Sequence, residues 1–102
     1  MIIHEVLAQL EKAAAPVIKV LQAHAAGKTL VIGFKSGMIL KEHRTTVPAR
    51  LLVIDGSVTY RQEGVAITLA KYADLEIPVD VLHSVEAQED SLCLLLVAKP
   101  AI

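Results

Sequence analysis

Two histidines that lie far apart along the chain, His43 and His83, have the residue type and setting to do chemistry. His43 lies in an apolar-rich run that opens at Gly37 and is broken at Pro48, and His83 follows a proline-containing turn. A neutral imidazole is a common ligand for Zn, Fe, Ni or Cu, and it is also a hydrogen-bonding group for a small molecule. We therefore expect the two rings to face each other across the interior of one barrel.

Side chains alternate across a strand, so an inward His43 predicts that Lys41 and Thr45 share its face, whereas Glu42 and Arg44 point outward. A tyrosine hydroxyl from a neighbouring strand would add a polar group at the mouth of the pocket. The predicted ligand-binding residues are His43, Thr45, Lys41, Tyr60 and His83.

A metal site at this pair needs more donors than two imidazoles. Catalytic metals are held by about three protein ligands plus an open position, and a hydroxyl such as that of Thr45 is a weak ligand for these metals. Glu76 reaches the interior only if its strand is shifted by one residue. Two interpretations stay open: a divalent Zn, Fe, Mn or Ni ion held by His43 and His83, or two histidines that are hydrogen-bonded pocket residues.

Other catalytic patterns are absent from the sequence. It contains no glycine-rich phosphate loop or dinucleotide fingerprint, and its serines lack the nucleophile-elbow pattern. The single cysteine, Cys93, lies between leucines, which predicts a buried side chain and not a reactive thiolate. His4 and His24 are isolated, and we expect both on the surface.

Composition excludes several classes of protein. The 102 residues are 54% hydrophobic and only 3% aromatic, so Val, Ile, Leu and Ala must build one core. The net charge of -1, with scattered basic residues, argues against nucleic acid or an anionic membrane as a partner. No apolar run approaches the ~20 residues of a membrane span, and no basic segment opens a signal peptide. We expect a cytoplasmic protein without disulfides.

Hydrophobic periodicity predicts one short helix followed by strands. Apolar residues recur at helical spacing over about residues 4–15, and Pro16 would end that helix. Turn signals then divide the chain at intervals of roughly 8 to 12 residues, which is typical of an all-β sandwich or barrel. We predict a single domain over residues 1–102, with the barrel over about 17–98. The predicted strands are 17–23, 29–34, 38–45, 49–55, 57–62, 65–69, 74–77, 82–87 and 92–98.

The stretch from Gly37 to Gly56 resembles the first motif of the cupin superfamily. That motif runs Gly, five residues, His, one residue, His, three or four residues, Glu, six residues, Gly. Gly37, His43 and Gly56 match it, whereas Thr45 takes the second histidine position and Ala49 or Arg50 takes the glutamate position.

The second cupin motif is matched at Pro78 and His83, while Tyr72 and Asp80 stand at its glycine positions and Ala87 at its asparagine position. The resemblance implies an all-β, RmlC-like jelly roll, the double-stranded β-helix barrel, with a short N-terminal helix. It implies a homodimer, for which the N-terminal helix and the first strand are our candidate contacts. It also implies degenerate metal motifs, because metal-binding cupins use ligand positions that this sequence only half retains.

Three functions are compatible with these residues. The first is a small-molecule-binding barrel around His43 and His83. The second is a metal-dependent enzyme of the dioxygenase or isomerase type, in which the two histidines anchor the metal. The third is a structural protein whose barrel is filled by aliphatic side chains and has no usable cavity.

Overall fold

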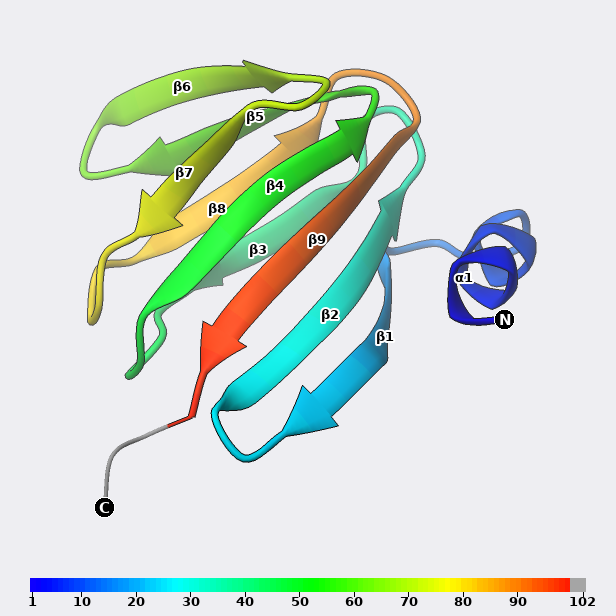
Figure 1. Ribbon diagram of the computed structural model, residues 1–102. Helices are drawn as coiled ribbons and strands as arrows, with labels where there is room; N and C mark the ends of the chain where they lie inside the picture. The colour runs from blue at the N-terminus through cyan, green and yellow to red at the C-terminus, as the bar shows by residue number, and fades with distance from the viewer. Residues whose placement is uncertain (100–102) are drawn as a thin grey trace.

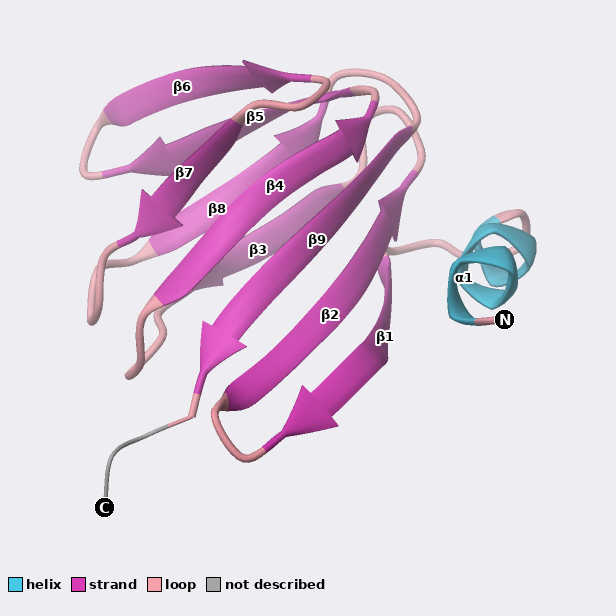
Figure 2. Cartoon of the chain, in the orientation of Figure 1, coloured by secondary structure: helices cyan, strands magenta, loops and turns pink. Residues whose placement is uncertain are grey.

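The computed structural model describes residues 1–99, which form one short helix and nine strands (Figures 1 and 2). The elements are α1 (Ile2–Leu10), β1 (Val17–His24), β2 (Gly27–Phe34), β3 (Ile39–His43), β4 (Ala49–Asp55), β5 (Ser57–Gln62), β6 (Val65–Ala70), β7 (Asp74–Ile77), β8 (His83–Ala87) and β9 (Ser91–Ala98). All nine predicted strands are present, and their ends differ from the predicted ones by at most two residues.

The strands form two antiparallel sheets that pack face to face. A five-stranded sheet in the order β1-β2-β9-β4-β7 lies in front of a four-stranded sheet in the order β3-β8-β5-β6 (Figure 1). Neighbouring strands are mostly distant in sequence, so the chain crosses repeatedly between the sheets, as in a jelly roll. The prediction of an all-β jelly-roll barrel with a short N-terminal helix is confirmed.

The main core lies between the two sheets and follows from the alternation of side chains. In β4, Ala49, Leu51 and Val53 are buried, whereas Arg50 between them is exposed. Burial raises the pKa of the Cys93 thiol to about 12, so this side chain stays protonated and packs as a small apolar group. The buried residues of this core are Ile32, Phe34, Ala49, Leu51, Val53, Val58, Tyr60, Leu69, Ile77, Val85, Ala87 and Cys93.

A second, smaller core forms where α1 packs on the outer face of the five-stranded sheet. Val6 is fully buried there against Val31, and Leu10 is 6% exposed. A Cβ atom at Gly33 would lie 2.7 Å from Val6 Cγ1, so the glycine lets the helix approach the sheet closely.

The C-terminal end of the helix comes earlier than predicted. The expectation of about 4–15 is wrong, because the helix runs over Ile2–Leu10 and has already ended well before Pro16. Leu10 is the last residue whose side chain reaches the sheet, and beyond it exposed charges and alanines offer little apolar surface to bury. Within residues 1–99, no helix has the length and apolar character to cross a membrane.

Four motif positions, Gly37, Gly56, Tyr72 and Asp80, have a left-handed backbone conformation. Gly56 has φ 82°, and a Cβ there would lie 2.3 Å from the carbonyl oxygen of Asp90, so only glycine fits. Tyr72 and Asp80, which stand where the second cupin motif has glycines, have φ 72° and 60°. The backbone of that motif is therefore retained although its glycines are not.

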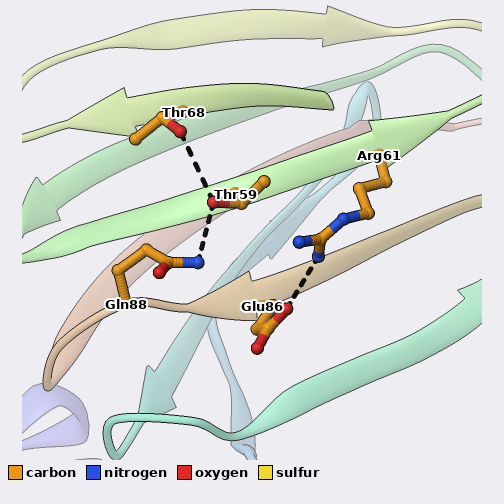
Figure 3. Close-up of polar contacts among 5 residues, drawn as sticks. All are labelled: Thr59, Arg61, Thr68, Glu86 and Gln88. Atoms are coloured by element: carbon orange, nitrogen blue, oxygen red, sulfur yellow. Dashed lines mark hydrogen bonds and ion pairs between the residues drawn. The ribbon is translucent and has the colours of Figure 1, made fainter. Parts of the chain in front are cut away.

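Polar side chains contact one another across the strands on the outer face of the four-stranded sheet (Figure 3). Thr59 lies between two polar neighbours: its Oγ1 accepts a 2.8 Å hydrogen bond from Gln88 Nε2 and lies 3.5 Å from Thr68 Oγ1. Arg61 pairs with Glu86 at 2.8 Å across β5 and β8. The inner face of the same sheet is apolar except at one end, where the two histidines lie.

Candidate functional site

The two histidines meet inside the barrel. His43 on β3 and His83 on β8 are direct partners in the register of the two strands, and their ring centroids are 4.2 Å apart with planes inclined at 59°. Because β3 and β8 are neighbours in one sheet, the rings lie side by side on one wall. The expectation that they face each other across the interior is therefore wrong in arrangement, although the two rings are brought together.

A β-bulge in β3 turns His43 inward. Leu40 and His43 both face the interior, although strict alternation over three positions would place them on opposite faces. The bulge holds Lys41 and Glu42, and both side chains are exposed. The prediction that Lys41 shares the inward face of His43 is therefore wrong, because the extra residue shifts the alternation.

Both imidazoles are held by the same backbone contact. Nδ1 of His43 lies 2.8 Å from the carbonyl oxygen of Lys41, and Nδ1 of His83 lies 3.1 Å from that of Val81. A carbonyl only accepts hydrogen bonds, so we assign the proton of each neutral ring to Nδ1. Nε2 of each neutral ring is then a hydrogen-bond acceptor.

His83 is the buried member of the pair. It is 2% exposed, and its ring stacks on that of Tyr60 at 5.7 Å and 24°. Burial lowers the pKa of His83, which its hydrogen bond to Val81 partly offsets and the nearby His43 lowers further. His83 is therefore neutral at neutral pH.

Tyr60 lies behind the histidine pair and not at a pocket mouth, since it is 1% exposed. Burial raises the pKa of its hydroxyl, which donates a 2.5 Å hydrogen bond to Oε1 of Gln62. Gln62 is opposite His83 in the register of β5 and β8, and our sequence analysis missed it. Alternation along β5 was the available signal, because it puts Gln62 on the same face as Tyr60.

Thr45 follows β3 and is half-buried. Its carbonyl accepts a 2.8 Å hydrogen bond from the backbone N–H of Asp80, which ties the loop after β3 to the loop before β8. Its Oγ1 is buried without a hydrogen-bond partner among residues 1–99. A buried hydroxyl left unpaired is costly, so this atom is suited to accept a partner that the chain does not itself supply.

A cavity of about 560 Å³ opens where the edge strands β1 and β3 leave the two sheets apart. We call this gap the open seam. His43 is part of the cavity wall, and Lys41 and Glu42 lie at its rim. Our sequence analysis missed the apolar wall, although inward alternation on β1 and β2 predicts part of it. Its main residues are Ile18, Leu30, Ile32, Ile39, Leu40 and Leu95.

The donor set at the histidine pair does not fit a resident catalytic metal. Within residues 1–99, no three His, Cys, Asp or Glu side chains lie close enough to hold one ion. Glu76 is exposed on β7, so it does not supply the missing carboxylate. Two imidazoles are one short of the usual three protein ligands, and we derive no chemical step through a metal.

Comparison with solved structures finds the same fold in several bacterial proteins. A conserved protein of unknown function from Streptococcus pyogenes has a TM-score of 0.79 at 18% identity, covering 89% of this chain and 80% of its own. An RmlC-like cupin from Desulfovibrio desulfuricans has 0.77 at 22%, covering 85% of each chain. A cupin superfamily protein from Desulfitobacterium hafniense has 0.79 at 16%, covering 93% and 89%. No protein-family model and no curated protein matches the sequence.

Proposed function

The protein has the RmlC-like cupin fold, a double-stranded β-helix barrel, and from this premise we propose that it binds a small molecule in the cavity of the open seam. The observation that carries the proposal is the cavity of about 560 Å³ with the His43 imidazole in its wall. Ligand pockets in proteins are typically about 300 to 1,000 Å³ and mostly apolar, with a few placed polar groups.

The site is supported from behind. Nδ1 of His43 is held by a backbone carbonyl, and its ring packs against that of His83, which itself stacks on Tyr60. A polar group fixed in this way orients a ligand at little cost in side-chain entropy. We propose that His43 contacts the ligand, while His83 and Tyr60 hold the His43 ring in position.

The cavity also argues against a merely packed scaffold. The main core is filled, and side chains such as Phe34 and Val53 are fully buried there. At the open seam, by contrast, Ile18 is 46% exposed and Ile39 is 50% exposed. Apolar side chains left half-exposed around a hollow are the usual mark of a binding surface.

A dye-binding experiment with two matched variants tests the proposal. Nile red, a neutral dye whose emission rises in apolar surroundings, is titrated into the wild type, Ile18→Trp and Val79→Trp. Ile18 lines the cavity, whereas Val79, which is 42% exposed, lies in the turn between β7 and β8. We expect binding to weaken at least about tenfold only in Ile18→Trp. Equal binding by all three proteins would refute the site.

The alternative, a metal-dependent dioxygenase or isomerase, is tested by metal analysis. The donor count predicts less than about a tenth of an equivalent of Zn, Fe, Mn or Ni in protein purified without a His-tag. A stoichiometric ion that is lost in the double variant His43→Ala, His83→Ala would contradict this expectation and favour the enzyme.

We also propose that two copies of the chain associate through α1 and β1. β1 is an edge strand whose Leu21 is 41% exposed, and Leu7 on α1 is 45% exposed. Covering such a strand and apolar surface favours pairing. Light scattering at tens of micromolar tests this, and a monomeric mass would overturn it.

A further inference from the structure

The wall of the cavity offers a ligand almost no charge. Eight of its eleven residues are apolar, and the other three are the consecutive residues Lys41, Glu42 and His43. Lys41 and Glu42 carry opposite charges, and both are exposed on the bulge of β3. Their charges offset each other at the rim, so the site favours neither an anion nor a cation.

The one polar group held in the wall is His43, and its own hydrogen bond determines which kind of ligand group it can bind. Nδ1 donates to the carbonyl oxygen of Lys41 at 2.8 Å, which leaves Nε2 of the neutral ring as an acceptor. An acceptor in an apolar wall is matched by a hydrogen-bond donor on the ligand. A ligand without a donor would desolvate this nitrogen and gain nothing in return.

Building on the proposed small-molecule site, we propose that the cavity takes a neutral, mainly apolar molecule with one hydroxyl, an alkylphenol or aliphatic alcohol, which donates to His43 Nε2. The apolar body lies against Ile18, Leu30 and Leu95, and the hydroxyl lies at the β3 wall. The class follows from the apolar wall, the offset rim charges and the single fixed acceptor.

The test is a matched ligand series measured by Nile red displacement at about pH 8. The ligands are para-hexylphenol, its methyl ether para-hexylanisole, and the anion para-hexylbenzoate. They share the apolar body and differ only in the polar group. We expect the phenol to bind about three- to tenfold more tightly than the ether and the benzoate, as one net hydrogen bond allows.

The variant His43→Phe keeps a ring in the wall and removes the acceptor. We expect it to reduce the affinity for the phenol to that for the ether, while the affinity for the ether stays unchanged. If this variant does not fold, the comparison of phenol and ether in the wild type remains a complete test by itself.

Each other outcome contradicts a defined part of the argument. Equal wild-type affinities for phenol and ether, or tightest binding of the benzoate, would overturn the ligand class but leave the proposed binding function. Failure of the dye and of every ligand to bind would overturn the binding function itself. If Ile18→Trp converted a dimer into a monomer in light scattering while Leu7→Glu on α1 did not, the second copy would cover the cavity and not α1, and the ligand class would be overturned.

Discussion

The two edges at which the sheets meet are built differently. At the edge we call the closed seam, the edge strands β7 and β6 are consecutive in the chain, and Ile77 and Leu69 belong to the same buried core. The short connection between these strands is bound to β4, because Val53 N donates to Ala73 O at 3.0 Å and Tyr72 N donates to Val53 O at 2.6 Å. At the open seam, β1 and β3 are not consecutive in the chain, and apolar side chains surround a cavity instead of filling it.

This difference shows that the same apolar residue types can be buried at one edge of the barrel and line a cavity at the other. Where a short connection joins the two edge strands, Leu69 and Ile77 are buried in the main core and contribute to stability. Where no connection joins the edges, the same residue types leave a hollow, and the polar group at its wall is held by a bulge. We therefore expect stability to depend mainly on the closed seam and the proposed ligand binding on the open seam, and substitutions at the two seams test this separation.

The largest effect is expected from truncation at the closed seam. Ile77 is 2% exposed, so Ile77→Ala removes buried methylene groups and leaves a cavity, at a cost of about 2 to 5 kcal/mol in the free energy of unfolding. Ile18→Ala, at 46% exposure, removes the same groups from the open seam and is expected to cost about 1 kcal/mol or less. Urea unfolding measures both, and equal losses would contradict the distinction between the seams.

The sequence predicts the bounds of an element well where nearby residues determine them, and poorly where packing against distant parts of the chain determines them. Strands β4, β5 and β7 have the predicted bounds, because turn residues such as Gly56 and Pro78 delimit them locally. The end of the helix is not determined by nearby residues, since it depends on where the surface of the sheet ends. The open seam is not determined locally either, because it depends on the spacing of the two sheet edges.

The candidate site shows the same division. The pairing of His43 with His83 is predictable from the matching motif positions, whereas the outward turn of Lys41 is not. The bulge has no glycine or proline to signal it, and it is defined only by the register of β3 against β8. A pattern of alternating residues in one strand carries no information about that register.

The second prediction concerns the pH dependence of stability that His83 on β8 causes. Burial lowers the pKa of His83 in the folded protein, so between about pH 6.5, the ordinary imidazole value, and the lowered value, the unfolded chain binds more protons than the folded one. Stability is therefore expected to fall as the pH drops below about 6.5. Urea unfolding across this range tests it with His83→Gln, which lacks the titrating ring. An equally steep loss in that variant would rule out His83 as the cause.

The third prediction tests backbone strain at the closed seam. Tyr72 has φ 72° and is 73% exposed, so its side chain gains little from burial while its backbone is held in the left-handed region. That conformation costs a non-glycine residue about 1 to 2 kcal/mol. Tyr72→Gly is expected to raise the free energy of unfolding by about 0.5 to 1 kcal/mol, because the greater entropy of the unfolded glycine offsets part of the gain. Tyr72→Ala is the control, and a similar gain from it would place the effect in the side chain.

The smallest effect is expected from the exposed ion pair between β4 and the edge strand β7 of the five-stranded sheet. Arg50 of β4 and Asp74 of β7 approach to 3.1 Å, but their side chains are 48% and 53% exposed. Pairs so exposed to water and salt contribute about 0 to 1 kcal/mol. Asp74→Asn is therefore expected to change the urea midpoint very little. The matched control is Glu86→Gln, which breaks the ion pair with Arg61 on the other sheet. A loss above about 2 kcal/mol in Asp74→Asn alone would mean that this ion pair contributes substantially to holding the edge strand β7 on β4.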